Sequence, residues 1–173
     1  MKYIMIMILL TISSFAEPYF KLTDYIFDVK YTNAEGLASI ELHSVDNRVA
    51  GKLDSIQWVF KEYKVTYLDQ SYCIQDSNKV MITPPRRGVF SLTENIPNPQ
   101  INLPPVIGDS IFVEQPLSNG KTMKGYLKVT EIVKYGKKSS DNKAWKIEAH
   151  NLHNKKYSAI FYYNENNGFV YFD

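Results

Sequence analysis

Beyond residue 120, apolar and polar side chains alternate with a period of two, and this pattern constrains the fold most strongly. Leu127 and Val129 hold odd positions, while Lys124 and Lys128 hold even ones. Successive side chains of a strand point to opposite faces, so such alternation is typical of strands with one buried face. Polar, turn-rich segments separate the alternating stretches at residues 136–143, 151–156 and 164–168. The sequence therefore predicts an antiparallel meander of four strands.

The same alternation assigns the two faces of this meander. On the buried face we expect Leu127, Val129, Trp145, Ile147, Ala149, Phe161 and Tyr163. On the opposite face we expect Lys128, Lys146 and Glu148. Because the side-chain period is two, a slip of one residue would reverse every assignment.

The N-terminal half is β-like but less regular. Asp76–Asn78 predicts a hairpin turn between two short strands. Residues 56–60 and 63–67 alternate with opposite parity, so the pattern switches at Lys61 and Glu62. The switch indicates either a β-bulge within one strand or a helical turn, and we favour the bulge. No long amphipathic helix is indicated, which predicts a mostly β protein.

Six of the 8 prolines fall within residues 83–108, which we call the strap. Proline donates no amide hydrogen bond and is excluded from central strands, so we expect an extended, polyproline-like coil that covers the sheet. Its apolar residues would pack on the sheet face: Phe90, Leu92, Ile96, Leu103 and Val106. Such a segment acts either as a binding loop or as a purely structural cover.

Residues 1–16 have the features of a signal peptide. Lys2 supplies a positive charge, an apolar stretch follows, and Ser14 and Ala16 provide the small residues of a cleavage site. The apolar stretch is about half the ~20 residues that span a bilayer. We therefore expect an exported protein of the periplasm or cell envelope, with one domain at 17–173 and no transmembrane segment after processing.

Several function classes are excluded or lack a motif. The formal net charge of +2 provides no basic field for nucleic acid. Nucleophile-elbow, phosphate-loop and zinc-helix motifs are absent, so we expect a protein that is not an enzyme and has no cofactor. The lone Cys73 allows no internal disulfide and is a buried inert thiol, a partner in an intermolecular disulfide or a reactive thiol.

Two sets of residues are candidates for ligand binding. Arg86 and Arg87 are adjacent in the strap, where guanidinium groups suit an anion or a lipid headgroup, or else pair with a surface carboxylate. Trp145, Phe161 and Tyr163 share one face and line a ligand cavity or fill the core.

A weaker candidate is a metal site formed by Glu148, His150 and His153. Glu148 and His150 share a strand face, and His153 follows in the turn, so three nitrogen and oxygen ligands are close in sequence. The alternative is a solvated edge without metal.

Two stretches resemble exported proteins of Bacteroidetes-type bacteria. They are KVMITPPR at 79–86 followed by NPQINLP at 98–104, and the hairpin FYYN…GFVY at 161–171. These are similar to uncharacterised exported β-proteins related to lipoprotein-carrier half-barrels. The resemblance implies a curved antiparallel sheet with an apolar concave face. The carriers' plugging helices are missing here, which makes the strap the candidate plug.

These observations lead to one expected function and one alternative. We expect a non-catalytic exported protein that binds an apolar or amphipathic, lipid-like ligand beneath the strap. The alternative is an envelope protein that binds another protein or assists assembly and has a fully packed core. A cavity under the strap would favour the first, and a solid core with an exposed apolar patch would favour the second.

The cleavage site can be tested directly. Because Ala16 is the last small residue of the motif, the exported protein should begin at Glu17. N-terminal sequencing of the exported fraction measures this, and an intact Met1 there would contradict the prediction.

Overall fold

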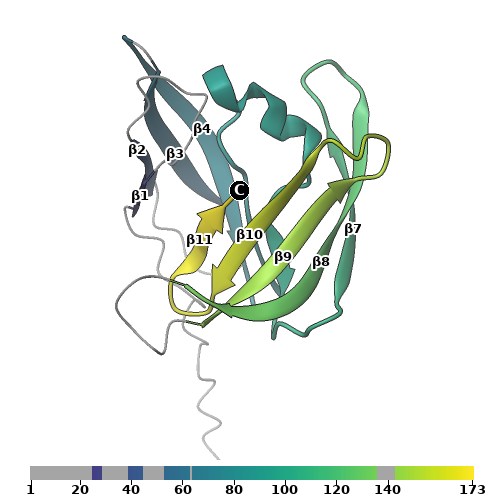
Figure 1. The fold of residues 1–173 in the computed structure, drawn as a ribbon. Coiled ribbons are helices and arrows are strands. Elements are labelled where there is room, and N and C mark those ends of the chain that lie inside the picture. The colour runs from purple at the N-terminus through teal and green to yellow at the C-terminus, as the bar shows by residue number, and fades with distance from the viewer. Residues whose placement is uncertain (1–24, 29–38, 45–52, 63, 136–142) are drawn as a thin grey trace, which may run out of the picture.

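A computed structural model describes residues 25–28, 39–44, 53–62, 64–135 and 143–173, so the expected signal peptide lies outside the described residues. The chain folds into two antiparallel sheets that face one another (Figure 1). The first sheet contains, in spatial order, β1 (Tyr25–Asp28), β2 (Ser39–Ser44), β3 (Leu53–Glu62), β4 (Val65–Gln75), β5 (Lys79–Ile82) and β6 (Gln100–Asn102). The second contains β11 (Gly168–Phe172), β10 (Ser158–Asn164), β9 (Lys143–Asn151), β8 (Thr122–Lys134) and β7 (Ser110–Pro116).

The core lies between the two sheets. Ile56 and Trp58 of the first sheet and Ile147 of the second belong to one cluster of buried apolar residues. The rings of Trp58 and Phe172 meet edge to face across the sheets, 6.2 Å between centroids. The mostly β fold is therefore confirmed, with its strands divided between two unclosed sheets instead of one curved sheet.

The C-terminal meander is confirmed, and so are its faces. Strands β8 to β11 pair in sequence order, each antiparallel to the next. Six of the seven residues expected inside are buried, and Trp145 is partly buried against the same core. Lys128 is exposed, and Lys146 and Glu148 are partly exposed on the outer face.

The expected bulged strand at 56–67 is wrong. The chain reverses between Glu62 and Val65, and β3 and β4 form a long antiparallel pair. Their register joins an even position to an odd one, as in Phe60 opposite Tyr67, so residues on the same face have opposite parity in the two strands. A two-residue hairpin loop produces this change of parity as readily as a bulge does. The turn at Asp76–Asn78 is confirmed, because the Asp76 carboxylate accepts backbone hydrogen bonds from Asn78 and Lys79.

The strap is only partly extended, which corrects the expectation of a continuous coil. Residues Gly88–Asn95 form a 3-10 helix, η1, at the top of Figure 1 between the ends of the two sheets. Residues 100–102 form β6, which pairs with β5 although prolines lie on either side of it. Within the described residues, no helix has the length and apolar character needed to cross a membrane.

The strap closes one end of the sandwich, and its residues 94–98 lie against the second sheet. The buried side chain of Gln115 accepts a hydrogen bond from the Asn98 amide (3.2 Å) and donates to the carbonyls of Glu94 (2.8 Å) and Ile96 (3.0 Å). From β9, Asn151 donates to the Asn95 carbonyl at 2.8 Å. The segment 94–98 is thus hydrogen-bonded to side chains from two strands of this sheet.

Residues 94–98 of the strap also contact β8 closely, at Gly125. A Cβ atom built on Gly125 would lie 2.5 Å from Cγ of Pro97 and 2.7 Å from the His150 carbonyl oxygen. No side chain fits at that distance, so glycine is required where Pro97 crosses the strand.

The first sheet holds the other end of the strap. Trp58 donates from its indole nitrogen to the Thr83 carbonyl at 2.8 Å, and the ring of Phe90 packs edge to face on Phe60. The expected packing of the strap's apolar residues is correct only in part. Ile96 and Leu103 contact the core, whereas Leu92 (60% exposed) and Val106 (52% exposed) face solvent.

We expect Gln115→Met to destabilise the fold strongly. The substitution keeps the volume but leaves two carbonyls and one amide of the strap without partners. Buried unpaired groups cost about 1–3 kcal/mol each, so the free energy of unfolding should fall by about 2–4 kcal/mol.

Chemical denaturation of the mature protein measures this change. The matched control is Gln70→Met, the same substitution at an exposed position of β4, which should shift stability by less than about 0.5 kcal/mol. Equal effects of the two substitutions would contradict a special role for Gln115.

Candidate functional site

Of the three aromatic residues that were candidates for a ligand cavity, Phe161 and Tyr163 lie in the core and Trp145 is partly buried against it. Phe161 and Tyr163 are 5% and 0% exposed. Their rings contact Phe172 and Phe169, with centroid distances of 5.8 and 5.4 Å. Trp145 packs on the outside of the same cluster. The rings of Phe161 and Tyr163 are therefore occupied by contacts with β11.

The adjacent arginines of the strap diverge. Arg87 is largely exposed, and its Nε lies 3.6 Å from a carboxylate oxygen of Asp69. Arg86 turns inward instead, and one of its terminal nitrogens donates to the Asn98 side chain at 3.0 Å. The Arg86 Nε is buried and has no hydrogen-bond partner among the described residues.

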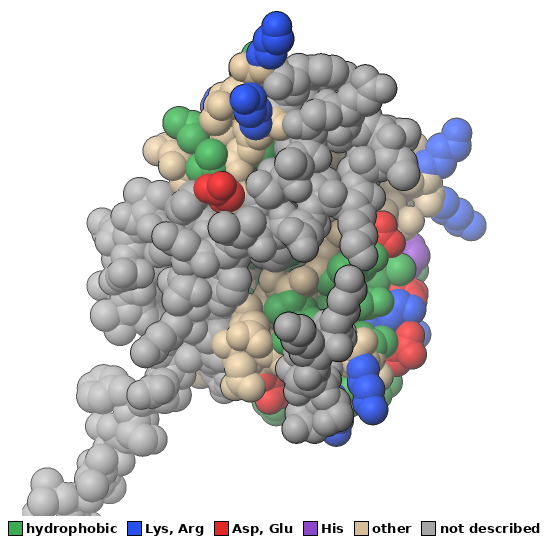
Figure 2. Space-filling view, turned by 60° about the vertical axis from the view of Figure 1, so that its left-hand side comes forward, with side chains coloured by type: hydrophobic (Ala, Val, Ile, Leu, Met, Phe, Trp, Pro, Cys, Tyr) green, Lys and Arg blue, Asp and Glu red, His purple; other side chains and the backbone are tan. Residues whose placement is uncertain are grey.

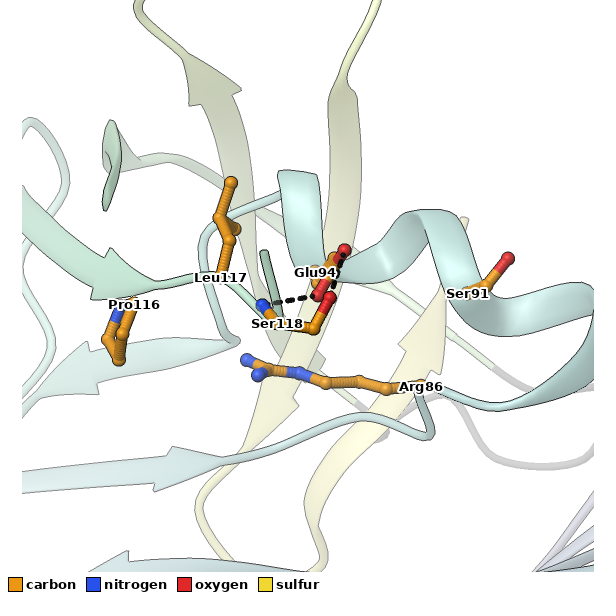
Figure 3. A pocket seen from close by; sticks show the side chains of 6 residues that line it. All are labelled: Arg86, Ser91, Glu94, Pro116, Leu117 and Ser118. Atoms are coloured by element: carbon orange, nitrogen blue, oxygen red, sulfur yellow. Dashed lines mark hydrogen bonds between the residues drawn. The ribbon is translucent and has the colours of Figure 1, made fainter. Parts of the chain in front are cut away.

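Arg86 lines a surface pocket of about 390 Å³ at the junction of the strap with the β7–β8 hairpin. Figure 3 shows its side chain extending toward Ser118 and Leu117. The Glu94 carboxylate on the same pocket accepts hydrogen bonds from the backbone amide and the hydroxyl of Ser118, both at 3.1 Å. This carboxylate is thereby tied to the hairpin, and Leu117 and Pro116 add an apolar wall.

The candidate metal ligands lie at one end of β9 and in the following turn. Nε2 of His150 lies 3.8 Å from the Glu148 carboxylate. His153 is exposed, and its backbone amide donates to Asn151. Among the described residues, no three His, Cys, Asp or Glu side chains lie close enough together to hold a metal ion.

A different cluster crosses the outer face of the second sheet. Phe112 on β7, Tyr126 on β8 and His150 on β9 are directly opposite one another in register. The Phe112 and Tyr126 centroids are 6.2 Å apart, and those of Tyr126 and His150 are 5.0 Å apart and stacked. Phe112 is 76% exposed. We call these three residues the aromatic row.

Charged residues of both signs lie on either side of the aromatic row. On one side Lys124 pairs with Glu114 at 2.7 Å. On the other, Lys146 lies 3.0 Å from Glu131 and 3.3 Å from Glu148. The hydrogen bond to Glu131, followed by that to Glu148, raises the pKa of the Lys146 ammonium group above its ordinary value.

At the right of Figure 2, described basic and acidic side chains lie close to one another, with hydrophobic side chains beside them. Such a surface favours contacts that combine apolar burial with ion pairs.

Sequence reasoning missed β7 and therefore the aromatic row. The stretch Ile111–Phe112–Val113 is a short apolar run that does not alternate, because a phenylalanine stands where a solvent-facing strand position normally has a polar residue. The signal was present in the flanks, since Asp109–Ser110 and Pro116 bound the run as turn residues bound a strand.

Comparisons with protein-family models, with curated proteins and with solved structures find no match to this chain. The resemblance of residues 79–86, 98–104 and 161–171 to exported β-proteins therefore stays a prediction. The candidate sites rest on their geometry alone.

Proposed function

We propose that this chain is an exported, non-catalytic protein that binds another protein of the cell envelope through the aromatic row. The observation that carries the proposal is Phe112, a large apolar side chain that is 76% exposed on the outer face of the second sheet, in its edge strand β7. Covering a phenylalanine contributes about 1.5–3 kcal/mol, so a partner that buries this ring gains a central anchor.

The surroundings of Phe112 support a protein partner. Aromatic residues are enriched at the centres of protein interfaces, and polar residues at their rims. Here Tyr126 and His150 extend the apolar centre, while Glu114–Lys124 and Lys146–Glu131 supply charges of both signs at the rim. A partner segment with apolar side chains between charged ones complements this arrangement.

The buried aromatic residues bear on the choice between the two functions expected from the sequence. Phe161 and Tyr163 contact other core rings, as they would in a packed interior. This favours a binding surface on the outside of the protein over a ligand cavity beneath the strap.

A photo-crosslinking side chain at position 112 tests the proposal. With benzoylphenylalanine in place of Phe112, we expect one defined protein to be crosslinked in intact cells of the organism that encodes the chain. Adding Tyr126→Ser should lower the yield about fivefold or more, because the neighbouring ring that completes the anchor is lost.

The control places the same group at Leu68, which is 52% exposed on the outer face of the first sheet. It should not give this product. The same product from both positions, or a yield unaffected by Tyr126→Ser, would contradict the proposal. Crosslinks to a second copy of this chain are distinguished by mass and are not counted.

The Arg86 pocket supports a second candidate function, the binding of a small amphipathic anion. The buried, unpartnered Nε of Arg86 and the apolar wall of Leu117 and Pro116 are the observations that favour it. Guanidinium groups bind anions through charge-assisted hydrogen bonds, and the wall suits an apolar tail.

The fluorescent anion 8-anilino-1-naphthalenesulfonate is a suitable probe for this pocket. Hydrogen bonds to charged groups contribute about 1.5–3 kcal/mol, so Arg86→Gln should weaken binding of the probe about tenfold or more. Arg87→Gln, one residue away and largely exposed, should leave the affinity unchanged. Equal losses in the two variants would show that the probe senses general charge and not the pocket.

A further inference from the structure

The second sheet ends in an edge strand that carries few of the usual protections against pairing. Edge strands are commonly kept short, flanked by proline, bulged or covered. The edge strand β6 has only three residues, between Pro99 and Pro104. At β11 the pairing with β10 is interrupted by a register shift between Tyr162 and Tyr163. By contrast β7 runs for seven residues in continuous register with β8, and its single proline is the last residue.

The free edge of β7 presents regularly spaced backbone groups. The Leu117 amide donates to the Lys121 carbonyl, and the Val129 amide donates to the Asp109 carbonyl. Hydrogen-bonded positions alternate along an antiparallel pair, so the odd positions of β7 bond to β8 and the even positions point outward. Among the described residues, the outward groups of Ser110, Phe112 and Glu114 make no backbone hydrogen bond.

We propose that two copies of this chain pair through β7, antiparallel, about a two-fold axis at Phe112. In this register Phe112 faces Phe112 of the second copy, and Ser110 faces Glu114 of the second copy. All three outward positions of each strand then exchange hydrogen bonds, as in a self-complementary interface. The five-stranded second sheet of one copy and that of the other copy then form one continuous sheet of ten strands.

Charge complementarity supports this register. Lys128 lies beside Ser110 on the outer face and has no ion pair among the described residues. Across the small Ser110 side chain it would reach Glu114 of the second copy, two strand spacings or about 10 Å away between Cα atoms. That Glu114 already pairs with its own Lys124. Each carboxylate would thus lie between two lysines, and the two-fold axis repeats the arrangement.

The aromatic row supports the register as well. Because the axis is perpendicular to the sheet, the outer faces of both copies lie on the same side. The row would continue from His150 and Tyr126 through Phe112 to the same residues of the second copy. Cross-strand aromatic pairs stabilise sheets, so the facing Phe112 rings add to the pairing. This inference goes beyond the binding of another envelope protein and needs only the β7 edge.

The first experiment measures self-association of the purified mature protein by sedimentation velocity, with no other protein present. We expect a concentration-dependent dimer. Glu114→Lys should weaken dimerisation about tenfold or more, because it places like charges together across the interface. Lys128→Glu should also weaken it, and the double variant should restore it. The control Lys134→Glu makes the same change on β8 beyond the residues paired with β7 and should have no effect.

The second experiment tests the register with disulfides. Hydrogen-bonded pairs have Cα atoms about 5.5 Å apart, within the range for a disulfide. The double variant Ser110→Cys with Glu114→Cys should form a covalent dimer under mild oxidation. Each single variant should not, because its cysteine faces a residue other than cysteine. The native Cys73 is 1% exposed and does not interfere.

Clear outcomes would overturn the inference. A monomer at all concentrations, or a dimer unaffected by Glu114→Lys, would exclude pairing through this edge. Covalent dimers from either single variant at the yield of the double variant would exclude the register. A crosslink from position 112 to another protein would leave each of these readouts unchanged, so the two proposals succeed or fail separately.

Discussion

The sandwich depends on hydrogen bonds between the strap and two buried side-chain amides, those of Gln115 and Asn151. The carbonyl groups of strap residues 94–96 lie outside any strand, and buried carbonyls without a partner are costly. Gln115 and Asn151, each 8% exposed, supply donors to the carbonyls of residues 94, 95 and 96. A side-chain amide suits this task because it donates and accepts at once, as Gln115 does with Asn98. Residues 94–98 of the strap are therefore hydrogen-bonded to the wall of the core.

The position of the strap against the second sheet also determines where the Arg86 pocket lies. The strap closes one end of the sandwich, and its outer side, at η1 and the β7–β8 hairpin, forms the Arg86 pocket. The same Glu94 whose carbonyl is bound by Gln115 holds Ser118 with its carboxylate. The interior of the sandwich and the wall of the pocket are thus linked through one residue. A substitution at Gln115 would disturb both, whereas one at Arg86 affects the pocket directly.

The sequence predicted the parts of the fold in which the two faces of a strand differ in polarity. In β8 up to Val129, in β9 from Trp145 and in β10, apolar residues alternate because one face meets the core and the other meets water, and the most buried apolar residues there hold the expected odd positions. The β3–β4 hairpin was misread because Lys61 to Lys64 contain no Gly, Asn or Asp to mark a turn. A change of parity alone does not distinguish a bulge from a two-residue loop. In both cases the residues on one face change from even to odd positions along the chain.

The candidate site was harder to predict, for related reasons. Parity places Phe161 and Tyr163 on the inner face, but a side chain that lines a cavity and one that fills a core have the same parity. Only the packing partners Phe172 and Phe169 distinguish the two. Adjacent Arg86 and Arg87 look equivalent in sequence, yet one turns toward Asn98 and the other toward Asp69. Local sequence does not specify such a divergence, because both partners are distant along the chain.

Phe112 belongs both to a strand that alternation did not predict and to a candidate site. Its strand was not predicted because Phe112 is apolar at an outward position, where alternation requires a polar residue. A polar side chain there would restore the alternation and remove the exposed ring without disturbing the core, because Ile111 and Val113 face inward on either side. The folded monomer therefore gains little from Phe112 beyond its contact with Tyr126. A residue that breaks the pattern of its strand and stabilises the monomer so little is best explained by contacts outside the monomer, which is where both proposals place it.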